Sequence, residues 1–574
     1  MLSADLNKQD HNMAQIKSVL TEVKTAFTNM SYTPDIPSTN LGAQEYNSGF
    51  NIETDIRGIR SVLGEEKILS ALPAGQTPIY VTGGYRANNV WWFIVATSAG
   101  NWYGINDSGI TNVTPGGTAI TGYNDNTNIT EAWNGTTLFI NAVDLTNTNT
   151  LPPPMYLTAT ASAFVEYSND PLGPGYIWNY NDDWSALTAG FMRLYNTPNV
   201  GSILIAGNLS ATDAISSIVE NYPTTVRWSR AFGLNDGPLS WQPTTQDVAN
   251  EVEVPVRGPV IDGFPSNGNF FVCSYWDTVC FSPISYQGTN NPVLGIRLFN
   301  QGRGLLNANC WANADNAVYG LDARDIWVFD GNNFKGLGNQ RVKNFFFQNL
   351  NPAYTNRVYI VNNTQKNQVE IYYPDRTSAT GWCNKMLAYR YDLDVFNAPR
   401  DIDSGSSATE APVYEQFPDS SFGFNPASRT VVYSRGIAAS QLVQKDRGHE
   451  FVSNTANVAI SSEFSRDNIH LLPNYSEQLM VHRILPEVNN LDEKGLPTIS
   501  TGTITIEVGG ADSVGQVPTY KPPVTIDIDT SNPWTQINQN VFRLNSIRIS
   551  NTSSVDTWIC PGITWQFTPT QDSR

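Results

Sequence analysis

The stretch from Asp322 to Phe347, DARDIWVFDGNNFKGLGNQRVKNFFF, holds the glycines, cations and aromatic side chains from which a phosphate site could be built. A P-loop needs the order G-x-x-x-x-G-K-[ST] between a strand and a helix, so that the helix start and the lysine both reach the phosphates. This stretch lacks that order. The alternation in IWVF predicts a strand, Asp330 to Asn333 predicts a turn, and FKGLG predicts the returning strand. Turn geometry therefore accounts for the glycines.

A nucleic-acid patch is the second chemistry that this stretch suggests. Cations and aromatic rings that could neutralise phosphates and stack on bases stand close together there: Lys335, Arg341, Lys343, Phe345, Phe346 and Phe347. The whole chain, however, has 34 Lys and Arg against 52 Asp and Glu, a formal charge of −18 that repels polyanions. Three adjacent phenylalanines are also typical of a core or an interface. We therefore expect no dedicated nucleic-acid-binding site.

Metal and cofactor chemistry has little support. The chain has four histidines, and none stands in an H-E-x-x-H or H-x-H arrangement; they are His11, His449, His470 and His482. Asp182 and Asp183 in NYNDDWS, and the acids of DIDTSN, could bind a cation but lack the spacing of an EF-hand. Solvated turns explain both. We expect no metal and no cofactor.

Catalysis is not predicted either. A propeller glycosidase would need paired carboxylates and, in sialidase-like enzymes, repeated S-x-D-x-G-x-T-W boxes, which the chain lacks. No G-x-S-x-G nucleophile elbow precedes a predicted helix. We therefore expect no enzyme activity and no catalytic residues.

The cysteines are too few and too scattered for a disulfide framework, so we expect buried, reduced thiols; they are Cys273, Cys280, Cys310, Cys383 and Cys560. No secretory signal opens the chain, and no apolar run approaches the roughly 20 residues of a membrane helix. N-x-[ST] sequons are present, but in a chain this rich in Asn, Ser and Thr they are expected by chance; examples start at Asn112, Asn128, Asn134 and Asn208.

The elements that would position these residues are mainly strands. Charged residues are only 15% of the chain, below the roughly 25% of ordinary domains, and aromatic residues reach 11%. Such usage favours strands joined by tight turns. NNVWWFIVATSAGNWYGIN reads as one hairpin, and ITEAWNGTTLFINAV as another with its turn at Asn134 and Gly135. Similar hairpins recur roughly every 40 to 60 residues, a spacing close to that of propeller blades.

We therefore predict an irregular β-propeller over residues 41–460. With 574 residues, the chain exceeds the roughly 250 to 300 at which a single core splits into domains. After residue 461 the alternating strands STGTITIEVGG, PPVTIDIDT, VFRLNSIRISN and TWICPGITWQFTP lack the hairpin aromatics. They predict a separate C-terminal β-sandwich-like domain over 461–574.

Residues 1–40 are the exception to the β pattern. Apolar residues recur there at three- and four-residue spacing and predict an N-terminal amphipathic helix followed by an extended, proline-containing linker; they are Leu6, Met13, Ile16, Leu20, Val23, Phe27 and Met30. Its apolar stripe could pack on its own chain or dock on a neighbouring subunit or ring. The residues predicted for docking are Met13, Ile16, Leu20, Val23 and Phe27.

Several motifs resemble, in this order, those of tail nozzle proteins of short-tailed bacteriophages. They are GFNIETDIRGIRSVLG, ITEAWNGTTLFINAVD, TTVRWSRAFGLNDGPLSWQP (Thr224 to Pro243), ARDIWVFDGNNFKGLGNQRVKNFFF, VEIYYPD, MLAYRYDLDVFNAPRD and SSVDTWICPGITWQFTP. The resemblance covers most of the chain after about residue 41. The predicted leading helix departs from that pattern, so no role is carried over to it.

The resemblance implies a structural protein of the virion tail, made in the host cytoplasm. Such a subunit would form a hexameric ring below the portal and adaptor, and would offer docking surface to tail fibres or spikes. Genomic DNA would pass through the lumen without specific binding. We expect part of the −18 charge to line that lumen, since a basic lining would hold the DNA. The alternative is a carbohydrate-binding or polysaccharide-degrading propeller of a phage tail or cell surface.

Overall fold

The computed structural model describes most of the chain. The described residues are 20–144, 152–169, 176–198, 200–244, 248–284, 294–378, 381–402, 413–418, 429–434, 442–452, 457–472, 477–492, 495–498, 502–528, 534–551 and 557–570, with 413–418, 429–434 and 538–539 described by their backbone alone.

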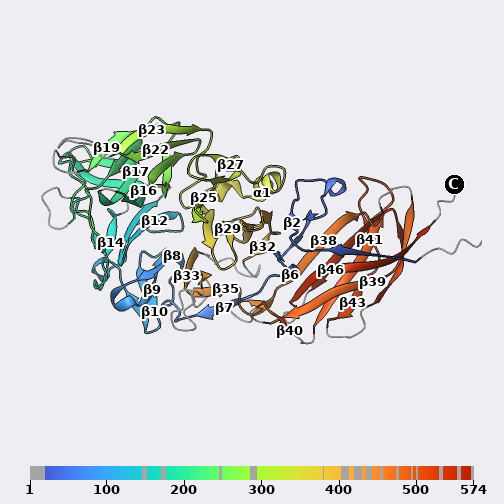
Figure 1. Cartoon of the computed structure of the whole chain (residues 1–574). Helices are drawn as coiled ribbons and strands as arrows, with labels where there is room; N and C mark the ends of the chain where they lie inside the picture. Colours follow the sequence, from blue (N-terminus) through green and yellow to red (C-terminus); the bar gives the residue numbers. More distant parts are fainter. Residues whose placement is uncertain are drawn as a thin grey trace, which may run out of the picture.

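Strands dominate these residues, and they are arranged in two lobes (Figure 1). The larger lobe is a β-propeller and the smaller, drawn mainly in orange and red, is a β-sandwich. The predicted fold class, mainly β with a propeller and a C-terminal sandwich-like domain, is confirmed. One α-helix lies within the described residues, α1 (Lys343–Asn349). Short 3-10 turns accompany it: η1 (Ser38–Asn40), η2 (Ala87–Asn89), η3 (Pro115–Gly117) and η4 (Pro352–Arg357).

The described propeller has seven antiparallel sheets, which follow one another along the chain. The first three contain β8 (Pro78–Tyr85), β9 (Trp91–Thr97), β10 (Trp102–Asn106) and β11 (Gly109–Asn112); β12 (Thr127–Asn134), β13 (Thr137–Asp144), β14 (Met155–Leu157) and β15 (Val165–Glu166); and β16 (Trp184–Thr197), β17 (Gly201–Asp213), β18 (Val219–Trp228) and β19 (Asn250–Glu253).

The next two sheets contain β20 (Val260–Ser266), β21 (Asn269–Ser274), β22 (Asp277–Pro283) and β23 (Leu294–Gln301); and β24 (Trp311–Ala314), β25 (Ala317–Leu321), β26 (Ile326–Phe329) and β27 (Phe334–Gly336). The last two contain β28 (Tyr359–Asn363), β29 (Gln368–Tyr373), β30 (Lys385–Arg390), β31 (Val395–Phe396) and β32 (Arg400–Asp401); and β33 (Val413–Pro418), β34 (Arg429–Ser434) and β35 (Leu442–Lys445) with β7 (Glu65–Ile68).

The seven sheets close into a ring. The first strands of consecutive sheets contact one another in turn from β8 to β20 and from β24 through β28 and β33 back to β8. The indole of Trp311 in β24 donates to Asp262 in β20 and joins the two runs. The last sheet is completed by β7, which precedes the first sheet in sequence and pairs with β35 so that Glu65 lies opposite Lys445. Hydrogen bonds between the two ends of the propeller therefore hold the ring shut.

The sandwich contains two sheets. One has β40 (Pro497–Thr498), β39 (Gln478–Leu491), β46 (Trp558–Thr570), β6 (Gly58–Ser61) and β5 (Ile52–Asp55), with β1 (Thr21–Ala26) on β46 and β44 (Thr535–Phe542) on β39. The other has β4 (Ser48–Phe50), β38 (Ser462–Ile469), β45 (Leu544–Asn551), β41 (Thr503–Ala511), β42 (Thr519–Tyr520) and β43 (Val524–Asp527). Two further pairs are β2 (Ser31–Tyr32) with β3 (Glu45–Tyr46), and β36 (Glu450–Phe451) with β37 (Val458–Ala459).

The prediction of an N-terminal helix is wrong for the last part of the predicted segment. Residues Thr21–Ala26 form β1, which runs antiparallel to β46 with Val23 opposite Trp565. Burial alternates along β1, and the half-buried positions are the β-branched Thr21, Val23 and Thr25, which favour a strand. The apolar spacing suggested a helix because Phe27, the next apolar residue, is buried just beyond the end of the strand. Residues 1–19, with Met13 and Ile16, lie outside the described residues.

The domain division also differs from the prediction. Strands β4 to β6, which lie between residues 48 and 61, belong to the sandwich, and the propeller begins only at β7. The sandwich thus takes strands from both ends of the chain, visible as blue strands among the orange ones in Figure 1. On the C-terminal side its strands resume at Ser462, beside the predicted boundary. Alternation predicts a strand but not its partner, which is why the early strands were assigned to the propeller.

The stretch from 322 to 347 forms the predicted hairpin. Strands β26 and β27 flank a turn in which Oδ1 of Asp330 accepts hydrogen bonds from the backbone N–H groups of Asn332 and Asn333. Gly331 has φ of +94°, which explains why glycine stands there. The three phenylalanines fall in or beside α1, and Phe346 is fully buried. The turn and the core role of the aromatic run are confirmed.

The linker after β2 is anchored to this helix. The carboxylate of Asp35 accepts the backbone N–H groups of Asn344 at 2.7 Å and Phe345 at 2.8 Å. A carboxylate at the first turn of a helix satisfies orphan donors and complements the helix dipole. The segment that connects β1 and β4, both in the sandwich, is therefore fastened to the propeller between them.

Candidate functional site

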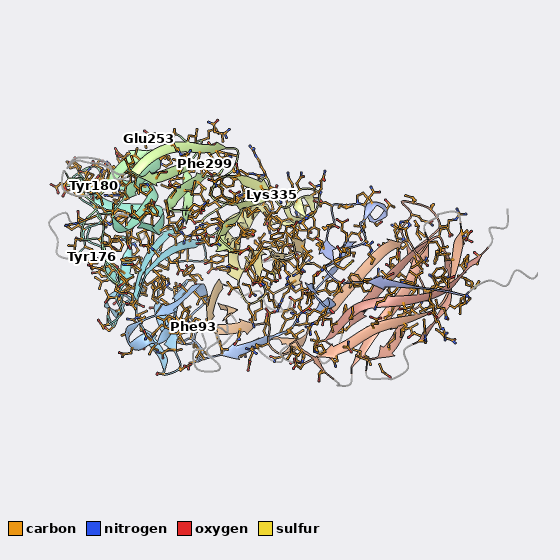
Figure 2. All side chains as sticks on the ribbon, viewed as in Figure 1. Phe93, Tyr176, Tyr180, Glu253, Phe299 and Lys335 are labelled. Carbon is orange, nitrogen blue, oxygen red and sulfur yellow. The ribbon has the colours of Figure 1, made fainter. Side chains whose placement is uncertain are left out.

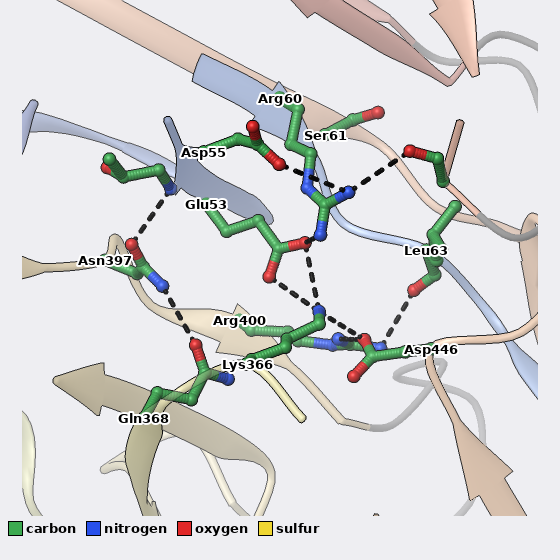
Figure 3. A network of polar contacts seen from close by, with 12 residues as sticks. Glu53, Asp55, Arg60, Ser61, Leu63, Lys366, Gln368, Asn397, Arg400 and Asp446 are labelled. Carbon is green, nitrogen blue, oxygen red and sulfur yellow. Dashed lines mark hydrogen bonds and ion pairs between the residues drawn. The ribbon is translucent and has the colours of Figure 1, made fainter. Parts of the chain in front are cut away.

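The most distinctive polar cluster of the described residues is a buried ionic network where the propeller meets the sandwich (Figure 3). The hairpin β5–β6 of the sandwich, the sixth propeller sheet and the end of the last propeller sheet all contribute to it. Its members are the cations Arg60, Lys366, Arg400 and Lys445 and the carboxylates Glu53, Glu370 and Asp446.

Lys366 bridges the two lobes. Its ammonium lies 2.8 Å from the carboxylate of Glu53, in the sandwich, and 2.9 Å from that of Asp446, just after β35. Glu53 also pairs with Arg60 at 2.5 Å, and Asp446 with Arg400 at 2.5 Å. Each of these two carboxylates is thus held by at least two cations, which is the condition under which burial of charge is tolerated.

A second buried pair joins the closing sheet to the sheet before it. Lys445 lies 2.6 Å from Glu370, and neither side chain has exposed surface. Glu370 also accepts hydrogen bonds from Asn363 at 2.8 Å, from Gln368 at 2.5 Å and from the hydroxyl of Tyr372. With these donors the buried carboxylate is well satisfied.

The electrostatics of the network keep its acids ionised. Burial by itself raises the pKa of Glu53, but Arg60 and Lys366 outweigh it and hold the pKa at about 2. The pKa of Asp446 lies well below its usual range, because Lys366, Lys445 and Arg400 outweigh the same effect of burial. A general base needs a pKa near the working pH. These carboxylates are therefore fixed charges that fasten elements together.

A second polar cluster lies between the first strands of the propeller sheets. Arg193 in β16 holds Asp262 in β20 with two hydrogen bonds, of 2.9 and 2.6 Å, and donates to Oδ1 of Asn309 at 2.7 Å. The amide of Asn309 in turn donates to the carbonyl of Ile129 in β12 at 2.9 Å. Although burial opposes it, Asp262 raises the pKa of Arg193. Together with Trp311 in β24, which donates to the same Asp262, this cluster ties strands of four sheets together.

These side chains occupy the centre of the propeller. The space left beside them, where β8, β12, β24 and β28 begin, is a cavity of about 60 Å³ lined by Tyr80, Asn128, Asn309 and Tyr359 among others. At about 30 Å³ for each water molecule, it holds about two waters. The centre of the propeller is therefore too filled for a nucleic-acid duplex to pass along its axis.

Three of the motif stretches meet at the junction. Asn51, from the stretch 49–64, donates to Asp401 at 2.8 Å, and the backbone N–H of Thr54 donates to Asn397 at 2.9 Å. Both acceptors belong to the stretch 386–401. Trp558, from the last motif, donates its backbone N–H to the hydroxyl of Ser61 at 2.9 Å. Segments from the beginning, the middle and the end of the chain thus build one joint.

The motif from Thr224 to Pro243 lies elsewhere. Its Arg227 is fully buried and stacks on Trp178, Tyr180 and Trp241, with 4.8 to 5.6 Å from the guanidinium to the ring centroids. Burial lowers the pKa of Arg227 to about 10. Tyr180 lies at the end of the propeller remote from the sandwich (Figure 2). This motif stabilises the outer part of one sheet.

The residues predicted for docking fall into two groups, those that the structure describes and those outside the described residues. Phe27 is fully buried against its own chain, with its ring centroid 4.9 Å from that of Phe464, and Val23 packs against the same core. Leu20 is 50% exposed. Phe27 and Val23 are therefore core residues, whereas docking by Met13 and Ile16, outside the described residues, stays a prediction.

The structure also locates the five cysteines and the two aspartates considered as a cation site. All five cysteines are free and buried, as predicted. Asp182 and Asp183 lie in the turn that precedes β16. Within the described part of the chain, no group of three or more His, Cys, Asp or Glu is arranged to hold a metal ion. No helix described here is long and apolar enough to cross a membrane.

The network residues were not predicted from the sequence. They are separated by up to several hundred residues. Four of them lie in the motif stretches, but nothing in those stretches marks them as members of one ionic cluster; they are Glu53, Arg60, Glu370 and Arg400. Lys445 carries a weak signal, since it is a charge at the end of the apolar strand LVQK. Only the closure of the ring, which brings β7 beside β35, shows why that cation is buried.

Comparisons with known proteins identify no family. No protein-family model matches the chain, and no curated protein matches it significantly. Among solved structures, similarity extends to the computationally designed Ika8 protein, with 11% identity and a TM-score of 0.33 over 66% of this chain and 100% of that one.

Two natural proteins are similarly distant. YCF48 from Cyanidioschyzon merolae has 9% identity and a TM-score of 0.32 over 66% of this chain and 98% of its own. An exo-beta-1,3-galactanase from Phanerochaete chrysosporium has 8% identity and a TM-score of 0.24 over 87% of this chain and 100% of its own. At such scores these likenesses carry no argument about what the chain does.

Proposed function

We propose that the chain is a structural protein of a virion tail, the nozzle or distal tail tube of a short-tailed bacteriophage, and that it has no enzyme activity. The observation that carries the proposal is the joint between the lobes. Three of the motif stretches that resemble nozzle proteins lie there and are hydrogen-bonded to one another. The resemblance thus falls on segments that share one mechanical task, to hold a propeller and a sandwich in a fixed relation.

The charges at the joint support a mechanical role. The buried carboxylates of the joint lie between two or more cations, and removing one partner would leave an uncompensated buried charge. Lys366 is bonded to both lobes, so the lobes cannot separate without breaking a buried pair. A subunit that must stay intact while a genome is forced past it needs such a joint.

The filled centre of the propeller constrains the assembly. Since the axis of one subunit is occupied by Arg193, Asp262 and Asn309, the lumen of the proposed tube has to lie between subunits. A ring of six subunits would use heterologous contacts in which one patch of each subunit meets a different patch of the next. The formal charge of −18 suits a lining that repels the DNA backbone and lets the genome slide. An adaptor ring above and tail fibres or spikes would be the other partners.

Electron microscopy tests the proposal directly. Negative-stain images of the purified protein, alone and mixed with its portal-side partner, are expected to show rings with an open centre that stack on the partner's rings. A protein that stays monomeric with that partner and degrades capsular polysaccharide would contradict the proposal and favour a tail hydrolase.

A further inference from the structure

The propeller has a second, larger cavity, of about 240 Å³, beside the small one at its centre. The two share Asn128, Ala308 and Asn356. The larger cavity lies where the first strands of several sheets begin, between the segments before β20, β24 and β28 on one side and strands β16 and β17 on the other. At about 30 Å³ per water molecule it holds about eight waters, the room that one sugar ring with its hydroxyl groups needs.

The lining of this cavity is polar but uncharged. No Asp, Glu, Lys, Arg or His is among the residues that line it, although the whole chain contains 86 Asp, Glu, Lys and Arg residues. Five carboxamides line it instead: Asn128, Asn208, Asn221, Asn307 and Asn356. Hydroxyl groups stand beside them on Thr188, Ser210 and Thr355. A carboxamide carries two donors and an acceptor, the groups that a polyol needs opposite it. Some of these groups already have partners in the protein, since Oδ1 of Asn221 accepts from Ser210 and Oδ1 of Asn128 from Asn309.

Asn307 carries the strongest sign of a ligand. Its Nδ2 donates to the carbonyls of Thr355 and, at 3.3 Å, Val358, so the orientation of the amide is fixed by the next sheet. Asn307 is only 7% exposed, and its Oδ1 has no hydrogen-bond partner among the described residues. A buried acceptor without a donor costs free energy, and a hydroxyl placed in the cavity would satisfy it.

An aromatic ring completes the wall. Tyr275, in the turn between β21 and β22, lines the cavity and is 36% exposed. Aromatic rings provide a flat apolar surface for the C–H face of a sugar, while polar groups opposite bind its hydroxyls. The absence of charge from this lining argues against anionic ligands, because nothing there would balance a carboxylate or phosphate once it lost its water.

We infer that this cavity binds one neutral saccharide unit, held by the Asn307 and Asn356 carboxamides and by the ring of Tyr275. The site lacks a carboxylate pair, so it binds its ligand without cleaving the glycosidic bond. The inference does not depend on the ring assembly proposed above, and the two can fail separately.

Ligand-observed NMR and calorimetry on the full chain test the inference. The probes are glucose, galactose, mannose and N-acetylglucosamine, with glucuronic acid and inorganic phosphate as anionic controls. At least one neutral sugar is expected to bind with a dissociation constant on the order of 1 mM, nearly independent of salt. Binding of none of the four, or equal binding of glucuronic acid, would overturn the site.

Matched variants locate the binding. Asn356→Leu keeps the side-chain size of a partly exposed residue and removes its amide, so it is expected to weaken binding at least tenfold. Asn332→Leu, in the exposed turn after β26, is the control and should bind as the parent does. If Asn356→Leu fails to fold, Tyr275→Ala provides the same test, with the neighbouring Trp276→Ala as its control. Unchanged affinity in a folded variant of the lining would refute the assignment.

Discussion

The ammonium of Lys445 lies 2.6 Å from the carboxylate of Glu370, and both side chains are completely buried. The pair joins the strand that ends the propeller to the sheet before it. Asp446, the next residue in the chain, forms ion pairs with Lys366 and Arg400. Lys366 also lies 2.8 Å from Glu53 of the sandwich. The ionic network that joins the last two propeller sheets therefore also contacts the sandwich.

Removing the cation of this pair should be costly. Lys445→Met leaves the carboxylate of Glu370 buried without its counter-ion, and we expect the free energy of unfolding to fall by about 3 to 5 kcal/mol. Urea denaturation followed by tryptophan fluorescence measures it. The matched control is Lys24→Met, because Lys24 pairs with Glu487 at the same 2.6 Å but with 53% and 36% of the side chains exposed. That control should change the free energy by no more than about 1 kcal/mol. Equal effects of the two substitutions would show that burial of the pair is unimportant.

The joint should make the protein sensitive to acid. The pKa of Glu53 is about 2 in the folded chain, below the roughly 4.3 of an unfolded glutamate. A carboxyl group whose pKa is lower in the folded state than in the unfolded state stabilises the fold at every pH above the unfolded pKa. This contribution is lost as the pH falls towards the folded pKa. We expect stability to decline from about pH 4.5 to about pH 2, measured by denaturation at each pH. Glu53→Gln should be less stable at pH 7 and should have a shallower decline, and a parallel curve would contradict the role of Glu53.

The centre of the propeller depends on a planar guanidinium. Arg193→Lys keeps the charge but cannot make the two parallel bonds to Asp262 and the bond to Asn309. We expect a loss of about 1.5 to 3 kcal/mol, the range for hydrogen bonds to charged groups. Arg257→Lys is the control, since Arg257 also pairs with an aspartate but is 60% exposed. Differential scanning calorimetry should show a clearly larger drop in Tm for Arg193→Lys. Similar drops would mean that the central pair contributes no more than a surface pair.

The N-terminal strand is expected to be part of the fold. Phe27→Ala should cost about 3 to 5 kcal/mol because the ring is fully buried, whereas Leu20→Ala, at a position 50% exposed, should cost much less. Deletion of residues 1–30 removes β1 and should destabilise the sandwich, so it cannot isolate a docking role. Deletion of 1–19 tests that role, with tail assembly as the measurement. Normal assembly after the shorter deletion would reject docking by Met13 and Ile16.

The thiols should not react with thiol reagents until the protein unfolds. Burial raises the pKa of Cys273 to about 12, and the other cysteines are also free and buried. Since the thiolate is the reactive form, Ellman's reagent should label essentially none of them in the native protein and all five in 6 M guanidinium. Rapid labelling of a native thiol would show that one of these sheets opens.

Local features were predictable because they depend on neighbouring residues. The alternation and aromatic content of the hairpins determined the mainly β fold, and the turn from Asp330 to Asn333 follows from side chains that cap their own backbone. Buried, reduced cysteines follow from their number and scatter. The segment from Thr21 to Ala26 shows the limit, because its spacing fits a helix while its β-branched residues fit a strand, and pairing with β46 decided between them.

Most strands and turns could therefore be predicted from short stretches of residues, since side-chain alternation and turn chemistry act over a few positions. Three features required the folded chain: β7 closes the propeller, the sandwich takes strands from both ends of the chain, and Glu53, Lys366 and Asp446 meet at one joint. They could not be predicted because a strand edge and a buried charge each accept many partners. The choice among them depends on the free energy of the whole packed chain.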